Sequence, residues 1–206
     1  MRQRSDVTPS MPMTTDEEAV RTRLVDAAAR CIVRRGDIRF RMAEVADEAD
    51  VVRSTVYRYY ASRDDLLLAL LLTRIDRGLT RWIAALRRPQ DAATSIRALV
   101  LNPVASVDDD PLNRALYAAE DGGLSTVLEH GADAVTDVVT AQVAPLFTQW
   151  RDSGQIHADL DLRDTLQWMS ATTSFLLTPA WRHRSLPAKR RFVDTYLLRA
   201  LLTRSA

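Results

Sequence analysis

The chain has few of the residues that build covalent or metal-bound sites. Its 206 residues include one cysteine, three histidines and six glycines. A single cysteine cannot form an internal disulfide, and the histidines lie on separate segments without the spacing of metal ligands. A glycine-rich phosphate loop and a Gly-x-Ser-x-Gly elbow are missing too. We therefore predict no catalytic site, no metal site and no cofactor.

Long apolar segments are also missing. The longest uninterrupted apolar run, residues 66–72, has seven residues, whereas a membrane-spanning helix needs about 20. The first fifteen residues are polar, contain Pro9 and Pro12, and lack the apolar centre of a signal peptide. We expect residues 1–15 to form a flexible arm and the protein to lie in the cytoplasm, with no membrane partner.

Strands are not predicted, because apolar and polar residues do not alternate over any sustained stretch. Helical periodicity runs almost throughout, so the predicted fold class is all-α. The predicted helices are Asp16–Arg35, Met42–Ala49, Arg53–Tyr60, Asp64–Leu86, Ala92–Leu101, Leu112–Ala119, Leu124–Arg151, Leu162–Leu177 and Ala188–Leu202. Pro145 is expected to kink or split the longest of them, because proline lacks an amide hydrogen and clashes with the preceding turn. Cys31 falls on the apolar stripe of the first helix, which predicts a buried structural thiol.

The most informative segment is residues 51–63, Val-Val-Arg-Ser-Thr-Val-Tyr-Arg-Tyr-Tyr-Ala-Ser-Arg. It carries three arginines, three tyrosines and three small hydroxyl side chains, and no acidic residue. On a short helix this mixture suits a surface that grips phosphates and probes base edges. The segment therefore predicts a recognition helix for double-stranded DNA.

Residues 42–60 have the pattern of two short helices joined by a tight turn, a geometry that lets the second helix enter a major groove. The residues Val45-Ala46-x-x-Ala49-x-Val51 and Thr55-Val56-Tyr57-x-Tyr59-Tyr60-x-Ser62-Arg63-x-x-Leu66-Leu67 resemble the DNA-binding signature of the TetR family of transcriptional regulators. The resemblance is specific over residues 24–67 and architectural afterwards. It implies a helix-turn-helix DNA-binding domain over residues 16–63 and a helical ligand-binding and dimerisation domain over residues 64–206.

The resemblance also implies which residues contact DNA. Base edges would be contacted by Arg53, Ser54 and Thr55, and the DNA backbone by Tyr57, Arg58, Tyr59 and Arg63. Arg41, before the second helix, is placed to reach a phosphate. A bidentate arginine contributes about 1–3 kcal/mol of discrimination for guanine, so Arg53 is the strongest candidate for sequence readout. The alternative for these positions is a solvated basic face, and for Tyr60 we expect a place in the core.

Two positions depart from the family pattern at the turn. Asp50 stands where the family usually has glycine, and we expect it to accept a left-handed backbone. Val52 stands where a serine or threonine usually caps the recognition helix, so a capping bond worth about 1 kcal/mol is lost or moved to Ser54.

For the body, the resemblance implies a homodimer through the last two long helices and a site for a small molecule. We assign to the dimer interface one apolar stripe on each of these helices: Leu162, Leu166, Met169, Thr173 and Leu176, and then Phe192, Val193, Tyr196, Leu197, Ala200 and Leu201. The alternative is that both stripes face the protomer's own core. The candidate ligand-pocket residues are Trp82, Tyr117, Phe147, Trp150, Trp168, Thr172 and Phe175. A cluster of basic residues near the last helix, Arg182, Arg184, Lys189, Arg190 and Arg191, is expected to face solvent.

Together these features predict a ligand-responsive transcriptional repressor rather than an enzyme. A homodimer would bind a palindromic DNA operator, and a largely apolar small-molecule effector would release it. The alternative is an all-α small-molecule-binding protein or enzyme with a degenerate DNA-binding module. Arg41, Asp50 and Val52 are the residues that would favour that alternative.

Overall fold

The computed structural model describes residues 15–86, 91–107, 109–118 and 123–203, which are helical apart from their connections and one β-bridge between Ile156 and Leu202. The all-α prediction is confirmed. Residues 1–14 of the predicted arm lie outside the described residues, and Thr15 already belongs to the first helix.

The first four helices are α1 (Thr15–Arg35), α2 (Met42–Glu48), α3 (Arg53–Tyr59) and α4 (Arg63–Ala85), each within one residue of its predicted ends. Local signals set their limits. Gly36 follows α1 with φ +77°, a left-handed conformation that glycine adopts without steric strain. Ser62 begins α4: its hydroxyl accepts the Asp65 amide at 3.1 Å, and the Asp65 carboxylate accepts the Ser62 amide at 2.9 Å.

The turn between α2 and α3 confirms the expectation for Asp50, which has φ +52°. The Asp50 amide donates to the Asp47 carbonyl at 3.3 Å, and the Val51 amide donates to the Ala46 carbonyl at 3.0 Å. This pair of bonds is a Schellman motif, in which one left-handed residue closes the end of a helix. The geometry of the turn therefore survives without glycine.

Substitutions at Asp50 should show whether the turn requires a left-handed backbone at this position or the aspartate side chain itself. We expect Asp50→Val to lower the free energy of unfolding by about 1–2 kcal/mol, because a β-branched residue disfavours the left-handed region. Asp50→Gly, the matched control, should leave it equal or higher. Thermal and urea unfolding followed by circular dichroism measure both. Equal stability of the two variants would contradict the assigned turn.

The remaining helices form the body. They are α5 (Ala92–Ala105), α6 (Pro111–Ala118), α7 (Gly123–His130), α8 (Ala132–Asp152), α9 (Leu162–Leu177), the single turn α10 (Pro179–Arg182), α11 (Leu186–Phe192), the π-helical segment η1 (Val193–Leu198) and α12 (Arg199–Leu201). The prediction missed α10, and it ended the fifth helix at Leu101, whereas α5 continues through Pro103.

The predicted long helix over residues 124–151 differs from the structure in two respects. It is split at Gly131 into α7 and α8, and Pro145, which was expected to kink or split it, lies inside α8, which continues to Asp152. Position 131 lies against α4, because a Cβ atom there would clash with Cδ1 of Leu68. Glycine at this position lets α4 approach the joint between α7 and α8.

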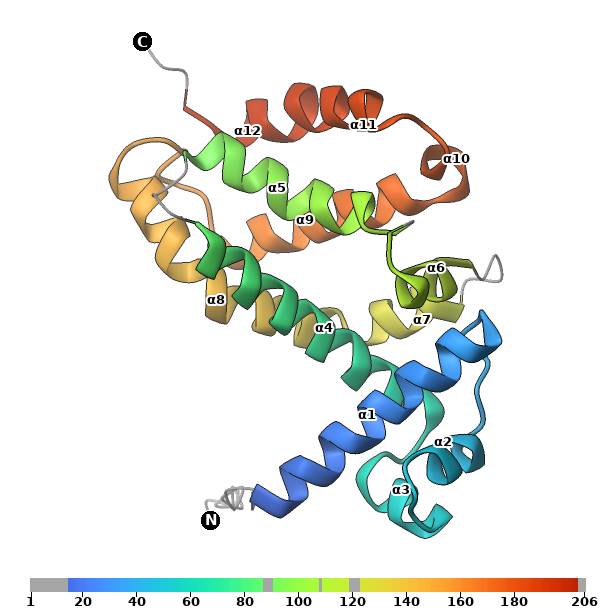
Figure 1. Ribbon diagram of the computed structural model, residues 1–206. Coiled ribbons are helices and arrows are strands. Elements are labelled where there is room, and N and C mark those ends of the chain that lie inside the picture. The colour runs from blue at the N-terminus through green and yellow to red at the C-terminus, as the bar shows by residue number, and fades with distance from the viewer. Residues whose placement is uncertain (1–14, 87–90, 108, 119–122, 204–206) are drawn as a thin grey trace, which may run out of the picture.

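Two apolar cores hold the chain together. The first is formed by α1–α4 together with five residues of α6 and α7: Leu112, Ala115, Leu116, Leu124 and Val127. The second is formed by α5, α8, α9 and the C-terminal helices. In Figure 1, α6 and α7 lie beside the C-terminal end of α1, and α4 runs from the first core to α8. Helices α6 and α7 therefore couple the body to the first four helices.

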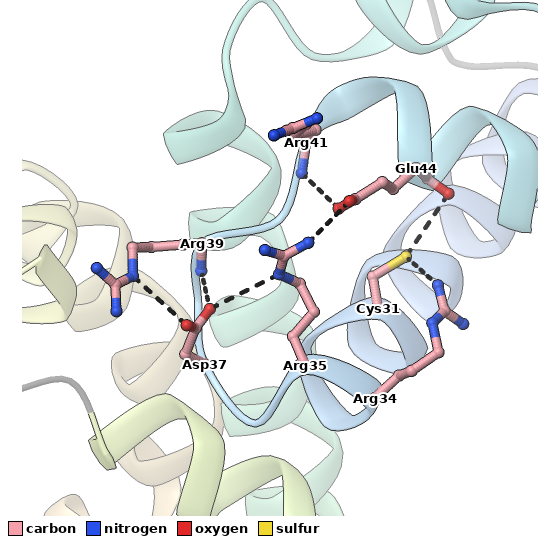
Figure 2. A network of polar contacts seen from close by, with 7 residues as sticks. All are labelled: Cys31, Arg34, Arg35, Asp37, Arg39, Arg41 and Glu44. Atoms are coloured by element: carbon pink, nitrogen blue, oxygen red, sulfur yellow. Dashed lines mark hydrogen bonds and ion pairs between the residues drawn. The ribbon is translucent and has the colours of Figure 1, made fainter.

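A network of ion pairs fixes α2 against α1. Arg35 pairs with Glu44 at 2.8 Å, and the Glu44 carboxylate also accepts the Arg41 amide at 2.9 Å (Figure 2). Arg30 and Arg34 both hold Glu48, at 2.6 and 2.7 Å, and their hydrogen bonds lower the pKa of this carboxyl. These contacts set the position of the helix-turn-helix on α1.

Cys31 lies at the centre of this joint and is fully buried, as predicted. Figure 2 shows its sulfur between the Glu44 carbonyl oxygen, at 3.6 Å, and the Arg34 guanidinium, at 3.4 Å. Burial raises the pKa of the thiol, although Arg34 acts in the opposite direction. The thiol is therefore protonated near neutral pH and is a packing group.

Candidate nucleic-acid interface

Helix α3 is held by one side and presents the other to solvent. Val56 is fully buried against the core residues of α2, and Tyr60, just after α3, is buried as predicted. Arg53, Ser54, Tyr57 and Arg58 are exposed. Because α3 carries no acidic residue, this outer surface offers hydrogen-bond donors and positive charge to an anionic partner.

The arginines of α3 lie on tyrosine rings. The Arg53 guanidinium carbon is 5.3 Å from the centroid of the Tyr57 ring, and Arg53 Nη2 donates to the Tyr57 hydroxyl at 3.2 Å. Arg58 lies over the Tyr59 ring at 5.0 Å and is within 3.4 Å of its hydroxyl. Cation–π contact of this kind restricts a flexible side chain before it binds a partner.

The start of α3 lacks a side-chain cap, as expected from Val52, which is 68% exposed. Of the two expected outcomes, loss of the capping bond or its transfer to Ser54, the structure shows the loss. The Thr55 amide donates to the Val52 carbonyl at 2.9 Å. The amides of Arg53 and Ser54 receive no side-chain cap and are donors for an incoming acceptor.

The other predicted DNA-contacting residues lie on α3 or close to its ends in the chain. Thr55 and Tyr59 are half-buried on α3 itself, and Arg63 is the first residue of α4, where it pairs with Asp64 at 2.8 Å. Arg41 is exposed immediately before α2, with its backbone amide bound to Glu44.

One cationic residue of this region was missed by the sequence reasoning. Arg21 of α1 lies over the rings of both Tyr59 and Tyr60, with its guanidinium carbon 5.4 and 5.6 Å from the two centroids. Nothing in the local sequence marks it, because α1 and the end of α3 meet only in the folded chain.

The seven candidate ligand-pocket residues are not brought together. Phe147 and Trp150 are buried in the second core, and Thr172 is buried on α9 with its hydroxyl bound to the Trp168 carbonyl at 2.9 Å. Tyr117 on α6 and Trp82 on α4 are half-buried. Trp168 and Phe175, by contrast, are 43% and 41% exposed on the outer face of α9.

The predicted dimer stripes are largely interior. On α9, Leu166, Met169 and Leu176 are buried in the second core, and the Thr173 hydroxyl donates to the Val100 carbonyl of α5 at 3.4 Å. On the last helix, Val193, Leu197 and Leu201 are also buried. These buried residues face the protomer's own core, so their placement against a second copy is wrong. Tyr196 and Ala200 of the same predicted stripe are exposed, and Phe192 is half-buried.

The outer side of these helices carries exposed and half-buried aromatic residues, of which Phe192 and Tyr196 belong to the predicted stripe. We call it the aromatic face, and it consists of Trp168, Phe175, Trp181, Leu186, Phe192 and Tyr196. Four of its rings form a continuous series: centroids are 5.3 Å apart for Phe175 and Trp181, 4.7 Å for Trp181 and Phe192, and 5.0 Å for Phe192 and Tyr196. Tyr196 is 63% exposed. Exposed apolar surface of this kind marks an interaction site.

The basic cluster near the last helix was expected to face solvent, and for one of its residues this expectation is wrong. Lys189, the chain's one lysine, is buried, and its ammonium donates to the Arg182 carbonyl at 2.9 Å. It thereby binds a free carbonyl at the end of α10. Arg184, Arg190 and Arg191 are exposed, and Arg182 is half-buried.

Within the described ranges, no helix is long and apolar enough to span a membrane, and no group of three or more potential metal ligands is found.

Comparison with known proteins addresses the N-terminal helices first. Residues 24–70 match the model of a family described as bacterial regulatory proteins, tetR family. Over 92 residues the chain is 33% identical to the HTH-type transcriptional regulator BetI of Brucella canis, a match that covers 43% of this chain and 46% of BetI. The match thus spans less than half of that relative's length.

Solved structures extend the likeness to the whole fold. Salmonella enterica GusR has a TM-score of 0.59 at 22% identity, with 91% of this chain and 97% of GusR covered. The transcriptional regulator FadR from Bacillus subtilis, solved in complex with stearoyl-CoA, has a TM-score of 0.58 at 18% identity, with 87% and 98% covered. At these identities the likeness establishes the all-α architecture.

Proposed function

We propose that this chain is a TetR-family repressor that binds a palindromic operator as a homodimer and is released by a small molecule. The observation that carries the proposal is the outer face of α3. It combines Arg53, Ser54, Tyr57 and Arg58 on a helix without acidic residues, anchored from behind by Val56. This role would place the protein in the cytoplasm, where bacterial DNA lies.

In the proposed complex the predicted roles are kept. Arg53, Ser54 and Thr55 at the start of α3 read base edges, and Arg41, Tyr57, Arg58, Tyr59 and Arg63 bind the DNA backbone. The N-terminal residues of a recognition helix are the ones that reach base edges in a major groove. The uncapped amides and the exposed guanidinium of Arg53 suit that position.

The proposed dimer uses the last two long helices, through the aromatic face rather than through the buried stripes. Aromatic side chains are enriched at the centres of protein interfaces, because they bury a large area with few rotatable bonds. A symmetric pair would present two copies of α3 to successive major grooves, about 34–36 Å apart or somewhat more.

The proposed effector site lies in the body, at the second core, where Phe147 and Trp150 are buried, and at α9, where Thr172 is buried. Of the other candidates, Trp82 and Tyr117 lie apart from this core, and Trp168 and Phe175 are reassigned to the aromatic face. The second core is apolar, which favours a largely apolar effector. FadR, which shares this fold, was solved with stearoyl-CoA, a ligand that includes a long acyl chain.

Release would act through α4, which contributes to the first core and packs against α8 of the body. At its first half Leu68 fills the space left by Gly131, and further along Asp76 accepts a hydrogen bond from Gln142 of α8 at 3.0 Å. Arg74 ties α4 to α6 through Asp110 at 2.6 Å and Asn113 at 2.9 Å. An effector that favours a different packing of α6 and α8 would therefore move α4, and with it the helix-turn-helix.

Two of the three residues that favoured a degenerate DNA-binding module now support a working one. Asp50 closes the turn in the required conformation, and Glu44 binds the Arg41 amide. The third, Val52, leaves α3 without a side-chain cap.

Fluorescence anisotropy on the DNA flanking the protein's own gene, against scrambled DNA of equal length, tests the proposal. At about physiological salt we expect a Kd near 10⁻⁸ M or tighter for the native fragment, with at least a ~10³-fold preference over the scrambled sequence. Equal weak binding, with no preferred fragment in a genome-wide selection, would contradict it.

A further inference from the structure

A hollow of about 320 Å³ separates the beginning of α1 from the end of α3. It is lined by Glu17 and Arg21 of α1 and by Arg58 and Tyr59 of α3. Two guanidinium groups, one phenol and one carboxylate thus meet at the edge of the recognition helix. The two helices that supply them are far apart in sequence and are joined here by side chains.

Tyr59 sets the positions of both cations. The guanidinium carbons of Arg21 and Arg58 lie 5.4 and 5.0 Å from the centroid of its ring. Arg21 also lies over Tyr60, whose phenol is buried in the adjoining core. Aromatic stacking holds a guanidinium in place and leaves the N–H groups at its edge free to donate.

Arg21 also has hydrogen-bonding capacity that the described part of the chain does not use. Its Nε is buried and has no hydrogen-bond partner there. A buried donor without an acceptor is unfavourable, so an oxygen that reached this nitrogen would be bound more tightly than at an exposed arginine. The planar guanidinium edge matches the oxygens of a phosphate.

We propose that this hollow binds one phosphate of the DNA backbone, with Arg21 and Arg58 as its donors and Glu17 as a carboxylate that weakens the contact. The inference rests on the proposed function. It adds Arg21 and Glu17 of α1 to the DNA-binding surface and gives Arg58 a specific place in it. When α3 lies in the major groove, the phosphates that flank the groove pass the ends of the helix and the neighbouring α1.

A backbone phosphate contact has two measurable signatures. It contributes equally to every DNA sequence, and it adds about 0.9 to the slope of log K against log salt for each phosphate neutralised. A residue that only positions α3 would change affinity and sequence preference together and leave that slope unchanged.

Arg21→Gln, compared with Arg23→Gln, tests the proposal by anisotropy on operator and scrambled DNA over a series of salt concentrations. Arg23 is exposed two residues further along α1 and lines a separate surface with Glu18. We expect Arg21→Gln to weaken binding to both DNAs by about tenfold and to lower the salt slope by about 1. Arg23→Gln should change affinity by less than about twofold and leave the slope intact.

A second matched pair probes the carboxylate and leaves both arginines in place. Glu17→Gln should tighten binding to both DNAs about two- to fivefold, because it removes a negative charge from beside the bound phosphate. Glu18→Gln removes the same charge from the same first turn of α1, outside the hollow, and should have no effect on affinity. If thermal melting shows that Arg21→Gln does not fold, the comparison of Glu17→Gln with Glu18→Gln still tests the proposal.

Two results would overturn the proposal. The first is an Arg21→Gln variant that behaves like Arg23→Gln, or that weakens binding with an unchanged slope. The second is a Glu17→Gln variant that matches Glu18→Gln. A wild type without any preferred DNA would instead contradict the proposed function itself.

Discussion

Arg53→Ala is expected to remove most of the operator preference and to leave general DNA binding almost intact. Arg53 is the first residue of α3 and is exposed, so it is the arginine best placed to meet a guanine edge. A bidentate arginine–guanine pair is worth about 1–3 kcal/mol of discrimination, which corresponds to an affinity loss of about 5- to 150-fold on the operator. On scrambled DNA only one exposed charge is lost.

The contact between Arg53 and Tyr57 should add to the operator affinity. Tyr57 holds the Arg53 side chain by its ring and its hydroxyl in the free protein, so less side-chain freedom is lost on binding. Tyr57→Phe keeps the ring and removes the hydrogen bond, and it should therefore weaken operator binding only a fewfold.

Anisotropy on operator, scrambled DNA and operators with single base changes measures this effect. Arg151→Ala serves as the control, because Arg151 is an exposed arginine at the end of α8, in the body. Arg53→Ala should bind one class of base-changed operator as well as it binds the native one. If the variant keeps the wild-type ranking of all operators, Arg53 does not read sequence.

Tyr196→Asp is expected to convert the dimer into monomers and to weaken operator binding by at least about 100-fold. Tyr196 is the most exposed aromatic residue of the aromatic face and ends its series of ring contacts. A charge buried in an apolar interface loses its hydration without gaining a partner, a penalty of the size found at interface hot spots. A monomer binds one half-site, so the affinity gained by linking two recognition helices in one dimer is lost.

Sedimentation velocity at micromolar concentration, together with anisotropy, tests this prediction. Phe175→Asp, at a second position on the aromatic face, should have the same effect, whereas Val33→Asp, on an exposed apolar residue of α1, should leave the dimer intact. Circular dichroism should show unchanged helix content in all three. If Tyr196→Asp and Phe175→Asp sediment as the wild type does, the dimer forms through another surface or not at all.

The sequence by itself determined most of the helices and the chemical character of the recognition helix α3. Gly36, Asp50 and the Ser62–Asp65 pair act through atoms no more than a few residues apart, so their effects could be predicted without a fold. The solvent-facing chemistry of α3 was equally local, because seven residues with two arginines, two tyrosines and no acid show their polarity in any helix.

The tertiary structure decided which face of each body helix is buried and which residues meet across the chain. Helix α9 has apolar residues on two sides, so its periodicity alone could not show that Leu166 and Met169 face α5 and α8 whereas Trp168 and Phe175 face outward. The break at Gly131 depends on Leu68, and the hollow at the recognition helix depends on Arg21, both supplied by distant helices. The physical reason is the same in each case. Caps and turns are governed by bonds between near neighbours, whereas burial and side-chain partners depend on how whole helices pack.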